Sequence, residues 1–285
     1  YSEAKSKLFE TEGLKSAVIN LDDDFGRILA EKYRGQLTVY GYSTSADIGA
    51  LEPCADFIVY AKSLKATKQG FEINVVTPKG AGYFALNLMG HFNVSNALAV
   101  LATLLLNNVT FDESIKRLQA IAPVAGRMEL IVAENKPTVI VDYAHTPQGI
   151  AAACNAVKQH FSAGLWCVFG CGGDRDREKR PLMAQAVERY ADHIIVTSDN
   201  PRHEDPQVII EQIVNGLAEP DAARTYVDRR EAIAHAVAHA TPDDVILIAG
   251  KGHESCQIVG DKYIVFDDRD VARALLDARD TGVNG

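Results

Sequence analysis

The second half of the chain alternates short apolar runs with amphipathic segments. Each run has the length of a buried strand, and each following segment repeats its apolar residues at helical spacing. Strands are expected at 138–142, 165–169, 193–197 and 245–249, and helices at 148–160, 181–190, 206–217 and 229–239. This order predicts βαβ units and a mostly parallel, doubly wound α/β sheet.

The first half has a different pattern. A strand at 16–21, a helix at 24–33 and a strand at 36–42 precede a stretch, 56–88, whose alternating residues predict half-exposed antiparallel strands. Two helices are expected next, at 94–106 and 111–121. Pro123 and Gly126 then break the pattern. The predicted domains are therefore 1–124 and 125–285.

The composition and net charge of the chain indicate which classes of binding partner are to be expected. The 285 residues are 47% hydrophobic and 24% charged, enough for two modest domains. A net charge of −9 disfavours a nucleic-acid groove, and no apolar run is long enough for a membrane span, so neither nucleic acid nor a membrane is expected as a partner. The five cysteines lack zinc-site spacing, which favours reduced thiols in the cytoplasm.

Polar clusters follow all four strands predicted in the second half. The clusters are 142–147, 172–177, 199–202 and 250–254. Parallel strands bring their carboxyl ends to one rim, where loops carry binding and catalytic groups. The clusters contain charges of both signs, so we expect a ligand that also carries both.

The third cluster is the most informative of the four. Asp199, Asn200 and Arg202 offer a carboxylate, an amide and a guanidinium within four residues. An aspartate can pair with an ammonium group, and an arginine grips a carboxylate at two points. The trio suits a zwitterionic amino acid.

Each cluster also has a plainer interpretation. The charges at 175–180 are typical of a solvated run before a helix capped by Asp174 or Asp176. His145 alone is more often a loop or packing residue than a catalyst, 199–201 is good turn chemistry, and 250–252 is typical of a tight turn. The glycine-rich stretch 170–173 lacks the spacing of a dinucleotide-binding fingerprint. The shared position of the clusters favours a binding site.

Six stretches occur in a fixed order along the chain. They are Gly90-His-Phe-Asn93-Val-Ser-Asn96, Gly126-Arg127-Met-Glu129, Val141-Asp142-Tyr-Ala-His145-Thr-Pro147, Phe169-Gly-Cys-Gly-Gly-Asp-Arg175-Asp, Asp199-Asn-Pro-Arg202 and Ala249-Gly-Lys-Gly-His-Glu254. The ordered set closely resembles the Mur ligases, within them the MurE-type branch, over nearly the whole chain. The Asn-Pro-Arg form resembles the enzymes that use meso-diaminopimelate.

This resemblance implies a fold and a reaction. The fold would be an incomplete central ATPase-type domain (1–124) followed by a Rossmann-like, amino-acid-binding C-terminal domain (125–285). The reaction would add meso-diaminopimelate to UDP-N-acetylmuramoyl-L-alanyl-D-glutamate in peptidoglycan synthesis. ATP would phosphorylate the D-glutamyl carboxylate with the help of Mg²⁺, and the amine would attack the acyl phosphate. The family expectation is a cytoplasmic monomer.

The resemblance also implies roles for single residues. Diaminopimelate would be bound by Arg175, Asp199, Asn200, Arg202, Gly250 and Glu254. The nucleotide would be bound by Asn93, Arg127, Asp142, Tyr143 and His145. Lys5 would be carbamylated and would position Mg²⁺, whose other ligands lie outside these residues. Without the resemblance, Lys5 is an exposed helical lysine and Asn93 a cap for the helix expected from Val94.

The phosphate-binding loop G-x-x-x-x-G-K-[ST] does not occur in these residues, and the chain starts without Met. We therefore expect a fragment that is inactive by itself, with the phosphate loop and the UDP-binding domain upstream. Two alternatives stay open. One is another Mur-type or folylpolyglutamate-type ligase with a different amine substrate, and the other is a non-catalytic α/β module that binds a small anion.

Overall fold

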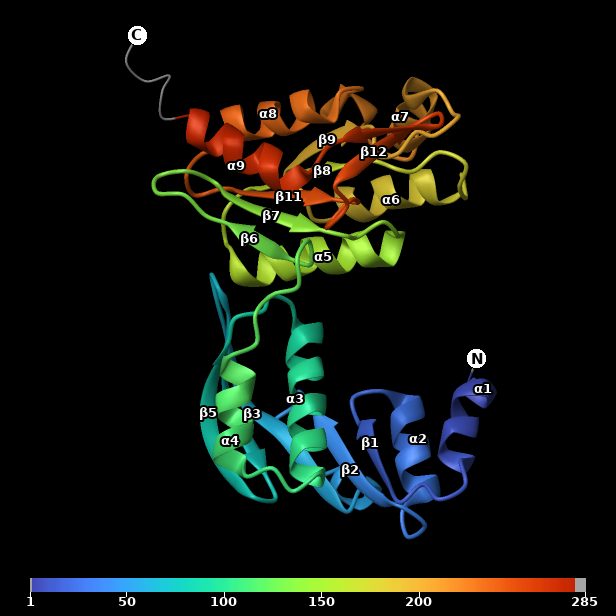
Figure 1. Ribbon diagram of the computed structural model, residues 1–285, viewed down its shortest axis with the longest axis vertical. Coiled ribbons are helices and arrows are strands. Elements are labelled where there is room, and N and C mark those ends of the chain that lie inside the picture. Colours follow the sequence, from blue (N-terminus) through green and yellow to red (C-terminus); the bar gives the residue numbers. More distant parts are fainter. Residues whose placement is uncertain (1, 280–285) are drawn as a thin grey trace. The chain divides into compact units, whose positions relative to one another are not determined.

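The computed structural model describes residues 2–279, which divide between Ala122 and Pro123 into two compact units. This division lies two residues before the predicted boundary. Each unit has a sheet and a hydrophobic core of its own (Figure 1). Among the described residues, no helix has both the length and the apolar character needed to cross a membrane.

The first unit is built on a five-stranded sheet in the order β1-β2-β3-β4-β5. Its strands are β1 Ser16–Asn20, β2 Thr38–Ser43, β3 Phe57–Thr67, β4 Gly70–Thr77 and β5 Gly80–Leu86. Its helices are α1 Ser2–Ser6, α2 Asp24–Tyr33, α3 His91–Leu106 and α4 Phe111–Gln119, with short 3-10 helices at Lys7–Glu10 and Glu52–Cys54. Strands β1 to β3 run parallel, and β3 to β5 are antiparallel.

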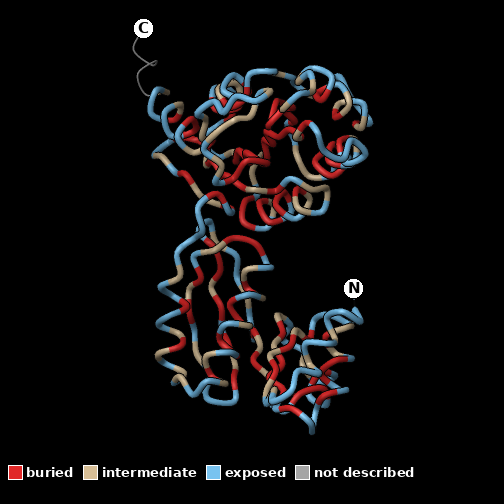
Figure 2. The backbone as a smooth tube through the Cα atoms, turned by 45° about the vertical axis from the view of Figure 1, so that its right-hand side comes forward, coloured by how far each residue is buried: buried red, intermediate tan, exposed pale blue. Residues whose placement is uncertain are grey.

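The strands of the first unit send alternate side chains to two cores. Ile19 and Val39 pack with Leu29 of α2, whereas Tyr40 and Val59 pack on the other face with the buried side of α3. The buried stretches of these strands are visible in Figure 2. The parallel part of the sheet is therefore covered on both faces.

Helix α3 starts three residues earlier than the sequence predicts. Its N-cap is Gly90, whose φ of 87° is a conformation that glycine adopts without strain. Asn93 consequently lies inside the first turn, where its Nδ2 donates to the carbonyl of Met89 at 2.8 Å. The interpretation of Asn93 as the helix cap is wrong.

The second unit is built on a six-stranded sheet in the order β10-β9-β8-β11-β7-β6. Its strands are β6 Glu129–Ile131, β7 Thr138–Asp142, β8 Leu165–Phe169, β9 His193–Thr197, β10 Arg224–Tyr226 and β11 Val245–Ala249. Its helices are α5 Pro147–His160, α6 Lys179–Glu188, α7 Pro206–Val214, α8 Arg229–His239 and α9 Asp268–Ala278, with a short 3-10 helix at Pro220–Ala222. All strand pairs are parallel except that of β6 with β7.

Helices cover both faces of this second sheet. The apolar sides of α8 and α9 share one core with alternate residues of β7, β8 and β11, and α5, α6 and α7 pack against one another on the opposite face. All residues of β8 and β11 are buried. The prediction of a doubly wound, Rossmann-like α/β fold is confirmed.

Several elements of the second unit are absent from the sequence prediction. Strands β6 and β10 have three residues each, too few for a periodic pattern to emerge. The sequence prediction also lacks helix α9 and the hairpin of β12 Cys256–Val259 and β13 Lys262–Val265. Only 175–178 of the charge run 175–180 precede helix α6, which begins at Lys179 and includes Arg180; neither Asp174 nor Asp176 is its cap.

Candidate functional site

The polar clusters of the second unit meet at the carboxyl ends of β7, β8, β9 and β11, as predicted. They surround a cavity of about 350 Å³. The residues lining it come from all four clusters and include each of the six predicted to bind an amino acid: Arg175, Asp199, Asn200, Arg202, Gly250 and Glu254. The sheet thus brings together residues that are up to 111 positions apart, from Tyr143 to Glu254.

Asp199 is a buried carboxylate that faces this cavity. The residue is 8% exposed, and its side chain makes no hydrogen bond to any described residue. Burial raises its pKa, and the charges of Arg229 and Lys251 act in the opposite direction without cancelling the effect. A carboxylate in this environment gains most from a ligand that brings a positive charge and hydrogen-bond donors.

Gly250 allows the chain to pass close to Asp199. Its φ is 120°, and a Cβ atom at this position would lie 2.5 Å from Oδ2 of Asp199. Any larger residue would therefore strain the backbone and displace the carboxylate. Gly250 contributes to the site by the space that it leaves.

Asn200, Lys251 and Glu254 form a hydrogen-bonded triangle beside Asp199. Nζ of Lys251 donates to Oδ1 of Asn200 at 3.0 Å and to Oε2 of Glu254 at 3.1 Å, and Nδ2 of Asn200 donates to the same Oε2 at 2.9 Å. Burial of Glu254 acts to raise its pKa, but these hydrogen bonds and the nearby positive charges outweigh it, so the pKa is lowered. Glu254 is therefore an ionised carboxylate near neutral pH.

Arg202 is held by its backbone. Its φ is 51°, its N–H donates to the carbonyl of Ile258 at 3.0 Å, and its carbonyl accepts from Gly260 at 2.7 Å. Both partners belong to the β12–β13 hairpin region. The guanidinium donates from Nη1 to the carbonyls of Gly173 at 2.8 Å and Asn200 at 3.5 Å, and Arg202 lines the cavity.

A buried ion pair holds the loop that carries Arg175 in place. Arg180, whose side chain is 1% exposed, binds both oxygens of Glu204 at 2.9 and 3.0 Å. Glu204 also accepts the backbone N–H of Asp174 at 2.7 Å, and Arg180 donates to the carbonyl of Gly172. The pair thereby ties the loop after β8 to the loop after β9, while Arg175 itself stays exposed.

Four of the residues predicted to bind a nucleotide lie next to one another in the second unit. The guanidinium of Arg127 lies 4.7 Å from the centre of the Tyr143 ring, which contacts the ring of His145 edge-on at 4.7 Å. Asp142 accepts the backbone N–H groups of Met128 at 2.9 Å and Ala144 at 3.0 Å. Burial raises the pKa of Asp142 despite these bonds. Asp142 therefore shapes the loops on either side of it.

The other two predicted residues belong to the first unit. Lys5 is an exposed residue of the short helix α1. Asn93 lies in the first turn of α3, as described above. Within residues 2–279, no group of three or more His, Cys, Asp or Glu side chains is arranged to hold a metal ion.

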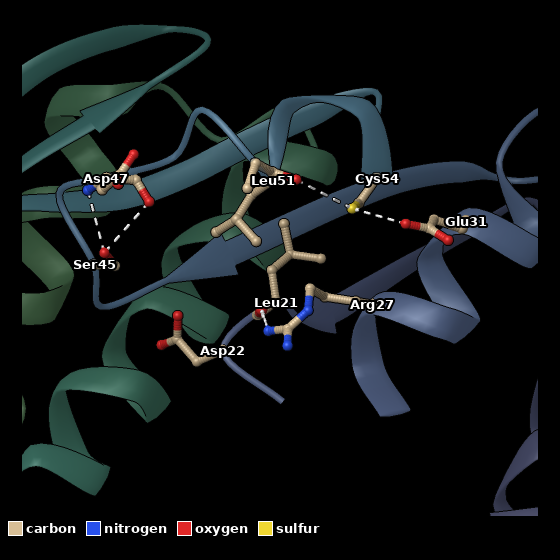
Figure 3. Close-up of a pocket in the computed structure, with 9 residues that line it drawn as sticks. Leu21, Asp22, Arg27, Glu31, Ser45, Asp47, Leu51 and Cys54 are labelled. Carbon is tan, nitrogen blue, oxygen red and sulfur yellow. Dashed lines mark hydrogen bonds between the residues drawn. The ribbon is translucent and has the colours of Figure 1, made fainter. Parts of the chain in front are cut away.

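The first unit has a cavity of its own, of about 500 Å³, at the carboxyl ends of β1 and β2 (Figure 3). Asp22 lines it but accepts hydrogen bonds from Ser43 and Thr44. Sγ of Cys54 lies 3.4 Å from a carboxylate oxygen of Glu31, and burial followed by this contact raises the pKa of the thiol. These side chains serve the local fold, and the sequence motifs do not include them.

Sequence reasoning missed the buried cations beneath the rim. Arg229 is 1% exposed, binds both oxygens of Asp268 at 2.7 and 2.9 Å, and donates to the carbonyl of Ala249 at 3.0 Å. Lys251 and Arg180 are 0% exposed. Lys251 lies inside the stretch Ala249–Glu254, and its place in that stretch was the only sequence signal that it belongs to the site. Arg180 and Arg229 read as surface charges because their acidic partners are 24 and 39 residues away.

Comparison with protein families gives two matches that together cover most of the chain. The Mur ligase middle domain matches residues 1–104, and the Mur ligase glutamate ligase domain matches residues 126–252. Among solved structures, one described as UDP-N-acetylmuramoyl-L-alanyl-D-glutamate--2,6-diaminopimelate ligase is 36% identical with a TM-score of 0.70. That similarity covers 98% of this chain and 56% of that one. A folylpolyglutamate synthase of Mycobacterium tuberculosis, at 21% identity, a TM-score of 0.55 and coverage of 82% and 61%, shares the fold.

Two curated relatives carry the name UDP-N-acetylmuramoyl-L-alanyl-D-glutamate--2,6-diaminopimelate ligase. The Coxiella burnetii protein is 43% identical over 276 residues, which are 97% of this chain and 56% of that protein. The Alkalilimnicola ehrlichii protein is 44% identical over 96% of this chain and 54% of its own length. The chain thus spans about half the length of the curated relatives that it matches.

Proposed function

This chain belongs to the Mur ligase family, and on that premise we propose that the whole protein is an ATP-dependent ligase that adds meso-diaminopimelate to UDP-N-acetylmuramoyl-L-alanyl-D-glutamate. Residues 1–124 would form part of the ATP-binding domain and residues 125–285 the amino-acid-binding domain. The protein would act in the cytoplasm as a monomer, and its five free thiols are in keeping with a reducing compartment. The relatives named above motivate the choice of substrates.

One observation carries this proposal: the cavity at the rim presents carboxylates and a guanidinium to a ligand of both charges. The side chain of Asp199 is buried and has no hydrogen-bond partner among residues 2–279, Glu254 is ionised, and Arg202 lines the same cavity. Diaminopimelate has two ammonium and two carboxylate groups. We assign one carboxylate to Arg202 and the ammonium group on the same carbon to Asp199 and Glu254, which leaves the other amino group free for the reaction.

The reaction requires that the amine be free to attack. After ATP has transferred its γ-phosphate to the D-glutamyl carboxylate and become ADP, the uncharged amine of the amino acid adds to the acyl carbon and forms the new C–N bond. The nitrogen then loses a proton, and the C–O bond to phosphate breaks so that phosphate leaves. The described residues would contribute by holding the amino acid in a fixed orientation, an effect that accounts for several kcal/mol of barrier reduction in such reactions. Arg127, Asp142, Tyr143, His145 and Asn93 would contact the nucleotide.

Magnesium is a separate part of the proposal. The described residues lack a ready-made group of metal ligands, so they do not fit a magnesium site by themselves. Lys5, as a carbamate, would supply one anionic group near it, and bound Mg²⁺ would neutralise phosphate charge.

The test is ADP release by the complete protein with UDP-N-acetylmuramoyl-dipeptide and Mg²⁺, comparing meso-diaminopimelate with L-lysine. Lysine lacks the second carboxylate and would leave Arg202 without a counter-charge, which costs about 1–3 kcal/mol, or about 5- to 150-fold in kcat/KM. Arg202→Ala should remove most of this discrimination. Equal turnover with lysine would refute the assignment of Arg202, and turnover with neither amino acid would favour a ligase for another amine or a non-catalytic binding module.

A further inference from the structure

Lys251 is a completely buried lysine beside the amino-acid cavity. Its exposure is 0%, in contrast to most lysines, which keep the ammonium group in water. A buried ammonium must be compensated by acceptors and negative charge. The acceptors here are Oδ1 of Asn200 and Oε2 of Glu254, at 3.0 and 3.1 Å.

This arrangement fixes the orientation of the Asn200 amide. Oδ1 accepts from Nζ of Lys251 and from the backbone N–H of Ile258 at 3.0 Å. Both of these groups are donors, so the NH₂ group of Asn200 would oppose them if the amide were flipped. Nδ2 must therefore point towards Glu254, which it contacts at 2.9 Å.

The two donors converge on one oxygen of Glu254. Oε2 accepts from both Asn200 and Lys251, whereas Oε1 has no hydrogen-bond partner among residues 2–279. The carboxylate is thus anchored through one oxygen and offers the other. Glu254 lines the cavity, and its side chain is 31% exposed.

We infer that Lys251 is a positioning residue, which orients Asn200 and Glu254 so that Oε1 of Glu254 accepts an ammonium group of the bound amino acid. The inference rests on the proposed function for the identity of that amino acid. Lys251 does not touch the ligand. Its contribution is to keep Glu254 ionised and in one orientation before the ligand arrives, which lowers the cost of ordering the site on binding.

The first measurement needs no ligand. The carboxyl ¹³C resonance of Glu254, assigned by its loss in Glu254→Gln, is followed against pH in the 285-residue chain and in Lys251→Met. The methionine removes the charge at similar length. The pKa of Glu254 should rise by about 1 unit or more, because burial is then opposed by one hydrogen bond and one positive charge fewer.

The second measurement is the affinity for meso-diaminopimelate by calorimetry. Lys251→Met should weaken binding about 10-fold, the usual effect of losing a hydrogen bond to a charged group. The effect should shrink to less than about 2-fold when measured in a Glu254→Gln background, because a residue that acts through Glu254 has little effect once that carboxylate is gone. Additive effects in this cycle would overturn the positioning role.

Lys136→Met is the matched control. Lys136 is another buried lysine of the same unit, with Nζ donating to the carbonyl of Leu276 at 2.6 Å, and it does not line the cavity. It should change neither the Glu254 pKa nor the affinity. Lys251→Gln, which keeps a neutral donor, should raise the pKa of Glu254 in the same way if the methionine variant does not fold.

The two proposals fail in different ways. An unchanged pKa of Glu254 in both Lys251 variants would overturn the positioning role whatever the ligand. Absence of diaminopimelate binding by the wild-type chain, together with the raised pKa in the variants, would count against the proposed substrate and leave the role of Lys251 in orienting Glu254 supported.

Discussion

Replacing Glu204 by glutamine should destabilise the second unit at neutral pH and leave its stability unchanged in strong acid. Glu204 binds Arg180 through both oxygens, and the side chain is 12% exposed. A glutamine would keep one acceptor, and its NH₂ group would face the N–H groups of Arg180. The buried guanidinium would then be left without a counter-charge.

The size of the effect follows from the ionisation of Glu204. Hydrogen bonds from Arg180 lower its pKa from 4.5 to about 2, against the opposing effect of burial. A shift of this size corresponds to about 3 kcal/mol at neutral pH, and partial exposure to water reduces it to about 2–3 kcal/mol. Breaking a buried ion pair by removing one partner costs a similar amount.

The sign of the pH dependence is also fixed. A carboxylate with a lowered pKa in the folded state stabilises the fold above the pKa of the unfolded state, and this contribution disappears as pH falls from about 4.5 towards 2. The gap between the wild type and Glu204→Gln should therefore be about 2–3 kcal/mol at pH 7 and close within that interval.

Urea unfolding followed by tryptophan fluorescence can measure this gap. The chain has one tryptophan, Trp166, which is buried on β8, so the signal reports on the second unit alone. Glu211→Gln, an exposed position on α7, is the matched control and should change the free energy of unfolding by less than about 0.5 kcal/mol. A gap that is the same at pH 7 and pH 3 would refute the argument.

Two further substitutions test the residues that face the cavity. Asp199→Asn should stabilise the second unit by about 1 kcal/mol, because it removes a buried charge that has no hydrogen bond, and it should weaken diaminopimelate binding at least 10-fold. Urea unfolding and calorimetry on one preparation measure the two effects. A variant less stable than the wild type would contradict the reasoning. Gly250→Ala should lower the free energy of unfolding of the second unit by about 1–3 kcal/mol and also weaken diaminopimelate binding, because the added Cβ would collide with Oδ2 of Asp199. Wild-type affinity for diaminopimelate in this variant would contradict the need for glycine.

The architecture of the second unit was predictable because four of its strands are long apolar runs buried on both faces. Val245–Ala249, for example, contains no polar residue and is followed at once by glycine. The short strand Arg224–Tyr226 has no such signal, since its three residues are stabilised by pairing with β9 and not by a pattern of their own. Local sequence therefore predicted the interior of this sheet and missed its edges.

The site was predictable for the residues that carry ligand chemistry and not for those that support them. Asp199 and Arg202 stand out because they follow a strand in a compact cluster. Arg180 stands in a run of charges, and only the folded structure brings Glu204 to it across 24 residues. Lys251 resembles an ordinary turn residue between two glycines until its burial is known.

The anchoring of Arg202 through its backbone has a consequence for how specificity can evolve. Because the hairpin holds the main chain at this position through Ile258 and Gly260, the side chain can be exchanged without rebuilding the loop. The φ of 51° lies in the left-handed region, which costs least for glycine and asparagine and most for β-branched residues. A single substitution at position 202 would therefore change which amino acid the site prefers as substrate and leave the surrounding fold in place.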